Sequence, residues 1–580
     1  MRTNTNGELR LSDVNKIVTL TGWVSKKRDL GGLVFVDLRD RYGITQLIVE
    51  PENKCYDLAT SLKMEYVIKV TGKVVERSSK NPNMPTGDIE VLVDELTILN
   101  EAELPPLLVQ DQTDALEETR MRYRYLDLRR PTMQNNLVLR HKTCMAIRNY
   151  FDELNFVEVE TPILGKSTPE GARDFLVPSR VHQGSFYALP QSPQLYKQLL
   201  MVSGMDRYFQ IVKCFRDEDL RADRQLEFTQ VDLEMSFVDE IDVQTVTEGC
   251  LKRVWKEVLG QDIVTPFPRM AYDDAMNNYG SDKPDTRFEM LLQNITDWAK
   301  KLDFSIFKDN IAAGGVVKAV VAKGAAAKYS RKEIDRLTLV AKKYHAKGLA
   351  WVKYEDTFSG SIAKFITEEL KEELVSTLKL DKGDLVLIVS DILENANTSL
   401  GALRLTLGHE LDLIDNDKFN FLWVVDWPLF EYSEEDGRYV AAHHPFTSPK
   451  DGHEELMLDH PELTKAKAYD VVLNGYELGG GSIRIFNQET QSKMFKAIGL
   501  SDDEVKVKFS YFVDALKYGT PPHGGLALGL DRLVMLITKN NNLREVIAFP
   551  KAASAKCLMS NCPTPVADSQ LDELKIKVNE

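Results

Sequence analysis

The stretch GGLALGLDR, residues 524–532, combines three glycines with an arginine that precedes the apolar run LVMLI. Glycines let a backbone approach a ligand closely, and Arg532 is expected where a strand passes into a helix. Neither the G-x-G-x-x-G spacing of a dinucleotide fold nor a G-K-[ST] triplet is present. A glycine-rich strand end is by itself more often a bulge or a tight bend. The stretch therefore needs partners elsewhere in the chain before it indicates a site.

A second candidate lies upstream, where the motif FRDE, residues 215–218, ends an apolar strand. A charged loop follows at residues 219–225, and the next strand begins with Glu227 and Phe228. A hairpin with an arginine at one strand end and an aromatic ring on the return strand can hold a nucleoside triphosphate by charge and stacking. A surface ion-pair cluster with Phe228 in the core remains the alternative.

Length and composition set the class of protein. A chain of 580 residues is too long for one hydrophobic core, which predicts roughly three or four domains. No apolar run approaches the ~18 residues of a membrane span, and the N-terminus lacks the apolar stretch of a secretory signal. We therefore expect a cytoplasmic protein with no membrane partner. The six cysteines are scattered and predict reduced thiols, and the close pair Cys557 and Cys562 lacks the further ligands of a zinc site.

The net charge of -15 argues at first against a nucleic-acid partner. The negative charge is unevenly distributed, because residues 1–100 carry 14 Lys and Arg against 14 Asp and Glu. Lys26, Lys27 and Arg28 form a basic cluster within this neutral part. An N-terminal module can therefore meet RNA locally on an otherwise acidic protein.

The pattern along the chain predicts a multidomain α+β protein. Five β-rich runs between residues 17 and 99, with a polar helical stretch at 55–63, are typical of a five-stranded OB barrel. A helix at 135–154, a strand at 156–163 and a helix at 193–202 precede strands that suit an antiparallel sheet. An Ala/Gly-rich region then indicates an inserted α+β domain. The expected parts are the barrel at 1–104, a hinge at 105–134, a catalytic domain in two segments at 135–280 and 421–556, the insertion at 281–420 and a C-terminal extension at 557–580.

Together with Thr161-Pro162, the two candidate motifs resemble the three signature motifs of class II aminoacyl-tRNA synthetases. The resemblance sharpens to the aspartyl-tRNA synthetase family, and the insertion is similar to the GAD-type domain of its bacterial form. It implies an OB-fold anticodon-binding domain, an antiparallel catalytic sheet and a homodimer formed around residues 151–163. The segments that carry it are TPEGARDF at 168–175, QSPQLYK at 191–197, FRDE at 215–218, residues 225–234, HHPF at 443–446, GYELGGGSIR at 475–484 and GLDR at 529–532.

The resemblance implies a site for ATP in which no protein nucleophile is needed. An aspartate carboxylate attacks the α-phosphorus, so the site must clamp a polyanion and stabilise charge. Arg216, Glu477 and Arg532 are the expected catalytic residues, with adenine between Phe228 and Arg532. Mg²⁺ is expected on Asp470 and Glu477, which we place on one strand-like segment. The full expected ATP-binding set is Arg216, Asp217, Glu218, Gln225, Phe228, Glu477, Gly529, Leu530, Asp531 and Arg532.

Recognition of L-aspartate requires cations that bind its side-chain carboxylate. The resemblance assigns Arg484 and Lys197 to this role. These charges also disfavour asparagine, whose amide is neutral. The α-ammonium group is expected on Glu170, Gln194 and Asp232, and His443 is expected to close over the substrate. The complete expected aspartate-binding set is Glu170, Ser192, Gln194, Lys197, Arg216, Asp232, His443 and Arg484.

In the barrel, the resemblance places Arg28, Phe35 and Gln46 on the anticodon of tRNA(Asp), since OB folds stack aromatic rings on unpaired bases. Phe35 as a barrel core residue is the alternative. Leu30 occupies a position that is often histidine in family members that also charge the asparagine tRNA, which predicts an enzyme restricted to tRNA(Asp), with no DNA partner. Three other functions remain open: a non-discriminating enzyme, an asparaginyl-tRNA synthetase, and a non-catalytic paralogue that binds RNA.

Overall fold

The computed structural model describes residues 1–168 and 172–579. The chain forms two compact units. The first contains Met1–Thr143, Asp219–Leu226 and Val534–Glu580, and the second contains Cys144–Glu218 and Glu227–Leu533. In the described part of the chain, every cysteine is a free thiol and no helix has the length and apolar character needed to cross a membrane.

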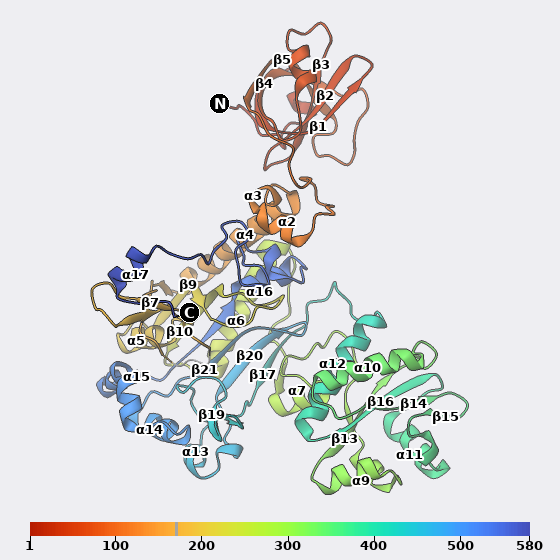
Figure 1. Cartoon of the computed structure of the whole chain (residues 1–580), viewed down its shortest axis with the longest axis vertical. Helices are drawn as coiled ribbons and strands as arrows, with labels where there is room; N and C mark the ends of the chain where they lie inside the picture. Colours follow the sequence, from red (N-terminus) through yellow and green to blue (C-terminus); the bar gives the residue numbers. More distant parts are fainter. Residues whose placement is uncertain (169–171, 580) are drawn as a thin grey trace. The chain divides into compact units, whose positions relative to one another are not determined.

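The N-terminal strands close into a barrel in the order β1-β2-β3-β5-β4, as drawn in red in Figure 1. The alternation of β2 explains the closure, because Val34, Val36 and Leu38 are fully buried while Phe35 and Asp37 stay half-buried on the outer face. The predicted OB fold and its five strands are confirmed. The elements are β1 (Ile17–Leu30), β2 (Leu33–Arg39), β3 (Ile44–Val49), α1 (Tyr56–Ser61), β4 (Val67–Glu76) and β5 (Ile89–Asn100).

Helices α2 (Glu117–Arg122), α3 (Arg124–Asp127) and α4 (Pro131–Glu153) follow the barrel. Asp127 is fully buried and accepts hydrogen bonds from Arg120, Arg124 and Arg130. α4 begins four residues before the predicted start at 135, because proline is well tolerated in the first helical turn, where its missing N–H has no partner to lose.

An antiparallel sheet of eight strands dominates the second unit, with parallel pairing only at its two edges. Its glycines bring strands close together, since a Cβ on Gly479 would lie 2.1 Å from the carbonyl oxygen of Ala527 on the next strand. The predicted antiparallel catalytic sheet is confirmed. In spatial order the strands are β11 (Arg269–Ala271), β17 (Phe421–Val425), β20 (Ala468–Leu473), β21 (Tyr476–Ile483), β22 (His523–Gly529), β10 (Glu227–Ser236), β9 (Arg207–Phe215) and β6 (Val157–Glu158).

Two local predictions were wrong. The strand expected at 156–163 is only β6, two residues long, because Pro162 has no N–H and the Thr161 hydroxyl donates instead to the Gln210 side chain at 2.9 Å. Asp470 and Glu477 lie on neighbouring strands, β20 and β21, rather than on one segment. The turn between these strands contains Asn474 and Gly475, both with positive φ, which is the strongest short hairpin signal.

A separate five-stranded sheet, with the order β12-β13-β16-β14-β15, follows β11 in the chain and precedes β17. Helices cover both of its faces, α10 and α12 on one and α9 and α11 on the other (Figure 1). The mixed α+β character is confirmed, while the limits 281–420 stay a prediction. The elements are α9 (Ser305–Ala312), α10 (Arg331–Lys343), α11 (Glu368–Leu378), α12 (Leu393–Glu410), β12 (Gln293–Asn294), β13 (Val316–Ala322), β14 (Ala350–Tyr354), β15 (Phe358–Gly360) and β16 (Asp384–Asp391).

Candidate functional site

Four buried charges meet on the eight-stranded sheet. Lys197 comes from α5 (Gln194–Val202), Asp232 and Glu234 from β10, and Arg484 from the residue after β21. The Lys197 ammonium donates to Asp232 Oδ1 at 2.8 Å and lies 3.5 Å from Glu234 Oε2. Arg484 donates two hydrogen bonds to Glu234, from Nε to Oε1 at 2.9 Å and from Nη2 to Oε2 at 3.1 Å. The structure thus brings three predicted aspartate-binding residues together around Glu234, which the sequence interpretation missed.

The two carboxylates differ in their electrostatic environments. Burial raises the pKa of Asp232, and the Lys197 charge only partly opposes this. Burial acts on Glu234 in the same direction, but the charges of Arg484 and Lys197 outweigh it and hold its pKa below the ordinary value. Asp232 Oδ2 has no hydrogen-bond partner among the described residues. This oxygen is suited to accept a hydrogen bond from an ammonium group of a ligand.

Within residues 524–532, Gly525 makes room for an acidic side chain of the neighbouring strand. A Cβ on Gly525 would lie 2.0 Å from Glu234 Oε2, so the missing side chain makes room for a carboxylate of the neighbouring strand. Gly480 plays the same part for Asp470, whose Oδ1 would be 2.4 Å from a Cβ. At these two positions the missing side chains accommodate carboxylates, and the predicted close approach of a ligand to residues 524–532 stays a prediction.

The two adjacent histidines border the charged group. Burial, followed by the Arg484 charge, lowers the pKa of His443 to about 4 and that of His444 well below its ordinary value. The His443 ring packs edge-on against Trp427, with centroids 5.0 Å apart. His444 Nε2 faces Arg484 Nη1 at 2.8 Å. Both imidazoles are therefore neutral at pH 7.

Three further predicted aspartate ligands lie near the start of α5 or outside the described residues, and Arg216 belongs to another segment. Gln194 is buried, and its Nε2 has no hydrogen-bond partner in the described chain. The Ser192 hydroxyl accepts from the Gln194 backbone N–H at 3.3 Å, so it shapes the first helical turn. Glu170 falls among the residues that the structure does not describe.

Arg216 follows β9, and its guanidinium carbon lies 5.3 Å from the centre of the Phe228 ring on β10. Phe228 is half-buried, which leaves part of the ring accessible. Asp217 accepts from Arg173 Nε at 2.7 Å, an arginine in the quoted TPEGARDF motif that was not selected as a site residue. Glu218 is also half-buried beside this pair in sequence. The hairpin thus presents a cation and an aromatic ring together.

The end of β22 meets the Asp470–Glu477 hairpin. Arg532 Nη1 donates to the carbonyl oxygen of Glu477, and Asp531 accepts the Thr229 backbone N–H at 2.7 Å. Asp531 therefore holds the backbone of β10 through this hydrogen bond. Gly529 ends β22, and Leu530 begins α16 (Leu530–Ile537) as a buried residue.

Asp470 is a buried acid. Burial raises its pKa well above the ordinary value, and the neighbouring Glu477 charge raises it further. A cation between these two carboxylates would relieve both effects. Among the described residues, no group of three or more His, Cys, Asp or Glu side chains is arranged to hold a metal ion.

Gln225 belongs to the first unit. Its amide clamps the backbone of Lys551, because Nε2 donates to the carbonyl at 3.2 Å and Oε1 accepts the N–H at 2.8 Å. The glutamine is buried. Its expected contact with the nucleotide stays a prediction.

Arg28, Phe35 and Gln46 meet on the outer face of the barrel. Arg28 lies 5.9 Å from the Phe35 ring centre and donates to Gln46 Oε1 at 3.0 Å. Arg77 donates to the same oxygen at 2.9 Å, and Glu90 accepts from Gln46 Nε2 at 2.7 Å. Arg28 Nε and Arg77 Nη1 are buried without a hydrogen-bond partner among the described residues. The sequence interpretation missed Arg77 and Glu90, which only the pairing of β3, β4 and β5 brings here.

Leu30 lies at the end of β1, beside the turn formed by Gly31 and Gly32, and is 60% exposed. An exposed leucine at the rim of this face is available to a bound nucleotide.

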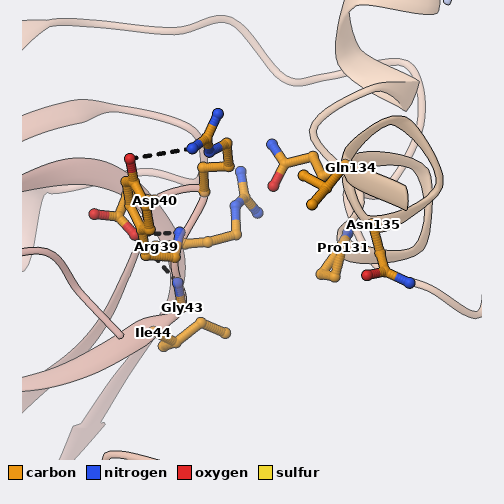
Figure 2. Close-up of a pocket in the computed structure, with 10 residues that line it drawn as sticks. Arg39, Asp40, Gly43, Ile44, Pro131, Gln134 and Asn135 are labelled. Atoms are coloured by element: carbon orange, nitrogen blue, oxygen red, sulfur yellow. Dashed lines mark hydrogen bonds between the residues drawn. The ribbon is translucent and has the colours of Figure 1, made fainter. Parts of the chain in front are cut away.

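A cavity of 410 Å³ lies at the Arg39 end of β2, within the first unit. Figure 2 shows barrel residues such as Arg39 on one side and Gln134 of α4 on the other.

Two family models match the chain in agreement with this architecture. The model of tRNA synthetases class II (D, K and N) matches residues 116–553, which include every strand of the eight-stranded sheet. The model of the OB-fold nucleic acid binding domain matches residues 18–99. The fold and the site therefore define the class as the class II aminoacyl-tRNA synthetases.

Relatives of similar sequence identify a family within this class. The chain is 57% identical to an aspartate–tRNA ligase of Macrococcus caseolyticus, covering 100% of this chain and 98% of the relative. It is 55% identical to an aspartate–tRNA(Asp/Asn) ligase of a Geobacillus species, with 100% and 98% covered. The chain belongs to the aspartate–tRNA ligase family of class II synthetases, and it is a ligase.

A solved structure shares the fold at low sequence identity. The asparaginyl-tRNA synthetase of Pyrococcus horikoshii, complexed with asparaginyl-adenylate, has a TM-score of 0.58 at 20% identity. The alignment covers 94% of this chain and 96% of that one.

Proposed function

We propose that this chain activates L-aspartate with ATP to give aspartyl-adenylate and pyrophosphate, and then transfers the aspartyl group to the 3′ end of tRNA(Asp). The observation that supports this most strongly is the pair of buried cations, Lys197 and Arg484, beside an Asp232 oxygen that has no hydrogen-bond partner in the described part of the chain. Such a group matches both ends of aspartate, since the cations suit its side-chain carboxylate and Asp232 suits its ammonium group.

In this proposal Gln194 and Glu170 assist Asp232 with the α-ammonium group, Ser192 shapes the pocket, and His443 closes over the substrate. Asparagine is disfavoured because its neutral amide compensates neither buried cation. The raised pKa of Asp232 adds a pH dependence. As pH falls, Asp232 takes up a proton at a higher pH than an ordinary carboxyl group, and aspartate binding weakens.

Activation proceeds by attack of the aspartate α-carboxylate oxygen on the α-phosphorus, with pyrophosphate as the leaving group. Arg216 stabilises the charge that develops on the phosphate and orients the carboxylate. Adenine stacks between Phe228 and Arg532. The nucleotide set further comprises Asp217, Glu218, Gln225, Glu477, Gly529, Leu530 and Asp531.

Asp470 and Glu477 would hold Mg²⁺, and the burial and the nearby Glu477 charge that together raise the Asp470 pKa support this assignment. When bound, the ion neutralises phosphate charge and supplies electrostatic stabilisation to the leaving pyrophosphate. Gly480 makes room for the Asp470 carboxylate in this arrangement.

Aspartate-dependent ATP–pyrophosphate exchange tests the reaction directly. We expect exchange with L-aspartate and Mg²⁺, and none above background with L-asparagine in the same assay. A folded protein that gives no aspartate-dependent exchange would support the non-catalytic alternative instead.

On the barrel, Phe35 is proposed to stack on an anticodon base while Arg28 and Gln46 read base edges. Arg28 Nε supports this role, because it is buried without a hydrogen-bond partner in residues 1–168 and 172–579. The Leu30 position supports charging of tRNA(Asp) alone, although relatives of similar identity include both restricted and dual-specificity names. Charging assays with the two purified tRNAs decide this point: efficient aspartylation of the asparagine tRNA would contradict it. Leu30→His is expected to increase charging of that tRNA.

We also propose a cytoplasmic homodimer formed around residues 151–163. Supporting this, β6 is an edge strand, and Val157 and Ile163 are 48% and 41% exposed in the single chain. Sedimentation equilibrium is expected to give twice the mass of one chain, and Val157→Lys is expected to shift the protein toward monomer. A monomer at micromolar concentration would contradict the proposal.

A further inference from the structure

Glu234 is a buried carboxylate to which the proposed reaction assigns no task. It has no exposed surface, yet it contacts both cations of the aspartate pocket. Burying such a group is costly unless its contacts are well made. Here both carboxylate oxygens receive Arg484 N–H groups, and Lys197 approaches the second oxygen.

The surrounding strands fix the carboxylate in place. Gly525 on β22 pairs with Glu234 on β10, and its missing side chain leaves the space that Oε2 occupies. The Gly525 carbonyl in turn accepts from the Tyr469 hydroxyl at 3.2 Å. Glu234 is therefore held by the sheet itself and not by a mobile loop.

This anchor determines the orientation of Arg484. Nε and Nη2 are directed to Glu234, while Nη1 is directed to the Ser482 hydroxyl at 2.6 Å and to His444. The plane of the guanidinium is thus fixed before any ligand arrives. Recognition of a carboxylate by a planar fork depends on an orientation within about 10–20°.

Glu234 also balances the charge of the pocket. Two cations, Lys197 and Arg484, face two carboxylates, Asp232 and Glu234. Without Glu234, the two cations would share one acid, and Arg484 would lose its only carboxylate partner among the described residues.

We propose that Glu234 is a positioning residue for aspartate: it does not touch the substrate, but it orients Arg484 and Lys197 so that their N–H groups meet the substrate's side-chain carboxylate. This inference rests on the proposed function, in which those two cations read aspartate. The opposite role, a mask that competes with the substrate for the cations, predicts the opposite effect of removing the charge.

Glu234→Gln in the full chain separates these two roles, since it preserves shape and removes the charge. We expect the KM for aspartate in pyrophosphate exchange to rise about tenfold or more, because hydrogen bonds to charged groups contribute roughly 1.5–3 kcal/mol. The KM for ATP should stay within about twofold, because the Arg216 and Phe228 hairpin is untouched. Glu234→Asp keeps the charge on a shorter side chain and is expected to give a smaller rise.

Glu248→Gln is the matched control. Glu248 is also buried in the second unit, but it accepts from the Phe267 N–H and from Trp423 Nε1 at 3.0 and 2.9 Å. The Glu248→Gln variant shows the effect of losing a buried carboxylate whose contacts are only structural. We expect a lower unfolding temperature and an unchanged KM for aspartate.

The outcomes distinguish the hypotheses. An unchanged or lower KM for aspartate in folded Glu234→Gln overturns the inference, as does an equal rise for ATP and aspartate. If Glu234→Gln does not fold, a Glu234→Asp protein with normal ATP KM and unchanged aspartate KM overturns it. Arg484→Leu tests the underlying assumption separately: if that variant keeps the normal aspartate KM, the proposed aspartate site fails and not only the role of Glu234.

Discussion

The chain buries two lysine–arginine pairs in very different surroundings. Lys197 and Arg484 on the eight-stranded sheet face Asp232 and Glu234. Lys318 and Arg404 of the five-stranded sheet region are just as buried, but they face neutral oxygens. Lys318 donates to the Asn277 carbonyl and the Asn397 side chain, and Arg404 donates to four backbone carbonyls in segment 285–290.

The difference appears in the electrostatics of the two pairs. Burial lowers the pKa of Lys318 to about 8 and that of Arg404 to about 10. Arg484 shows the reverse, since the Glu234 charge more than offsets burial and raises its pKa. Burial of a cation therefore does not mark a binding site. In the proposed function, the paired carboxylates and the Asp232 oxygen, which has no hydrogen-bond partner among the described residues, distinguish this cluster from a purely structural one.

The largest effect is expected from a substitution of Arg484. Arg484→Leu leaves Glu234 buried without its main partner, and breaking a buried pair costs about 3–5 kcal/mol. We expect kcat/KM for aspartate in pyrophosphate exchange to fall about 100-fold or more. Equilibrium binding of ATP by the same preparation controls for folding. Near-normal aspartate kinetics would contradict the assignment of this pair to the substrate.

Arg404→Met tests the other pair. The variant leaves several buried carbonyls without donors and removes a cation stacked 3.9 Å from the Phe288 ring centre. We expect a stability loss of roughly 2–4 kcal/mol, seen as a lower unfolding temperature and faster hydrogen exchange in segment 285–290. Pyrophosphate exchange at 25 °C should be retained. Loss of exchange in the folded variant would show that this pair serves the reaction.

Lys318→Met is expected to have a smaller effect, which depends on pH. The folded pKa of Lys318, about 8, lies below its unfolded value. The unfolded chain therefore binds more protons between pH 8 and about 10.5, and stability rises with pH in that window. Below pH 8 the cost of burying the ammonium is fully present, so the stability of the variant relative to wild type should be highest there, about 1–3 kcal/mol above its relative value at pH 11. The Asn277 and Asn397 oxygens lose their donor in the variant at every pH, which shifts the whole curve without changing this difference.

The measurement is the difference in unfolding free energy between wild type and Lys318→Met across pH 7–11. The stability of the variant relative to wild type should fall through the window, because the wild-type lysine then loses its proton. A constant difference would mean that Lys318 does not titrate with the lowered pKa.

A third arginine environment lies on the barrel, where Arg77 supports Gln46 from a partly exposed face. Arg77→Leu is expected to raise the KM for tRNA in aminoacylation about tenfold, within the usual cost of losing one base-reading arginine. Pyrophosphate exchange without tRNA should not change. Equal loss in both assays would argue against a role in RNA binding.

Much of the architecture follows from local pattern. The five β-rich runs predict the OB fold, but the apolar run around Val34, Phe35 and Val36 leaves open which face is buried, and only the structure places Phe35 on the outer face. The motifs predict the class because they resemble the signature motifs of class II aminoacyl-tRNA synthetases, and singly each of them fits other kinds of site. The exact start of α4 and the short β6 were not predictable at this level, since both depend on local proline chemistry.

What the sequence determined by itself is the class of protein and the residue types of its site. Only the tertiary structure decided which charges compensate one another. Glu234 and Arg484 are 250 residues apart, and the register of β10, β22 and β21 brings them together. Gly525 illustrates the reason: its role depends on the side chain of a strand far away in sequence, and close packing across a sheet carries no periodic signal within either strand.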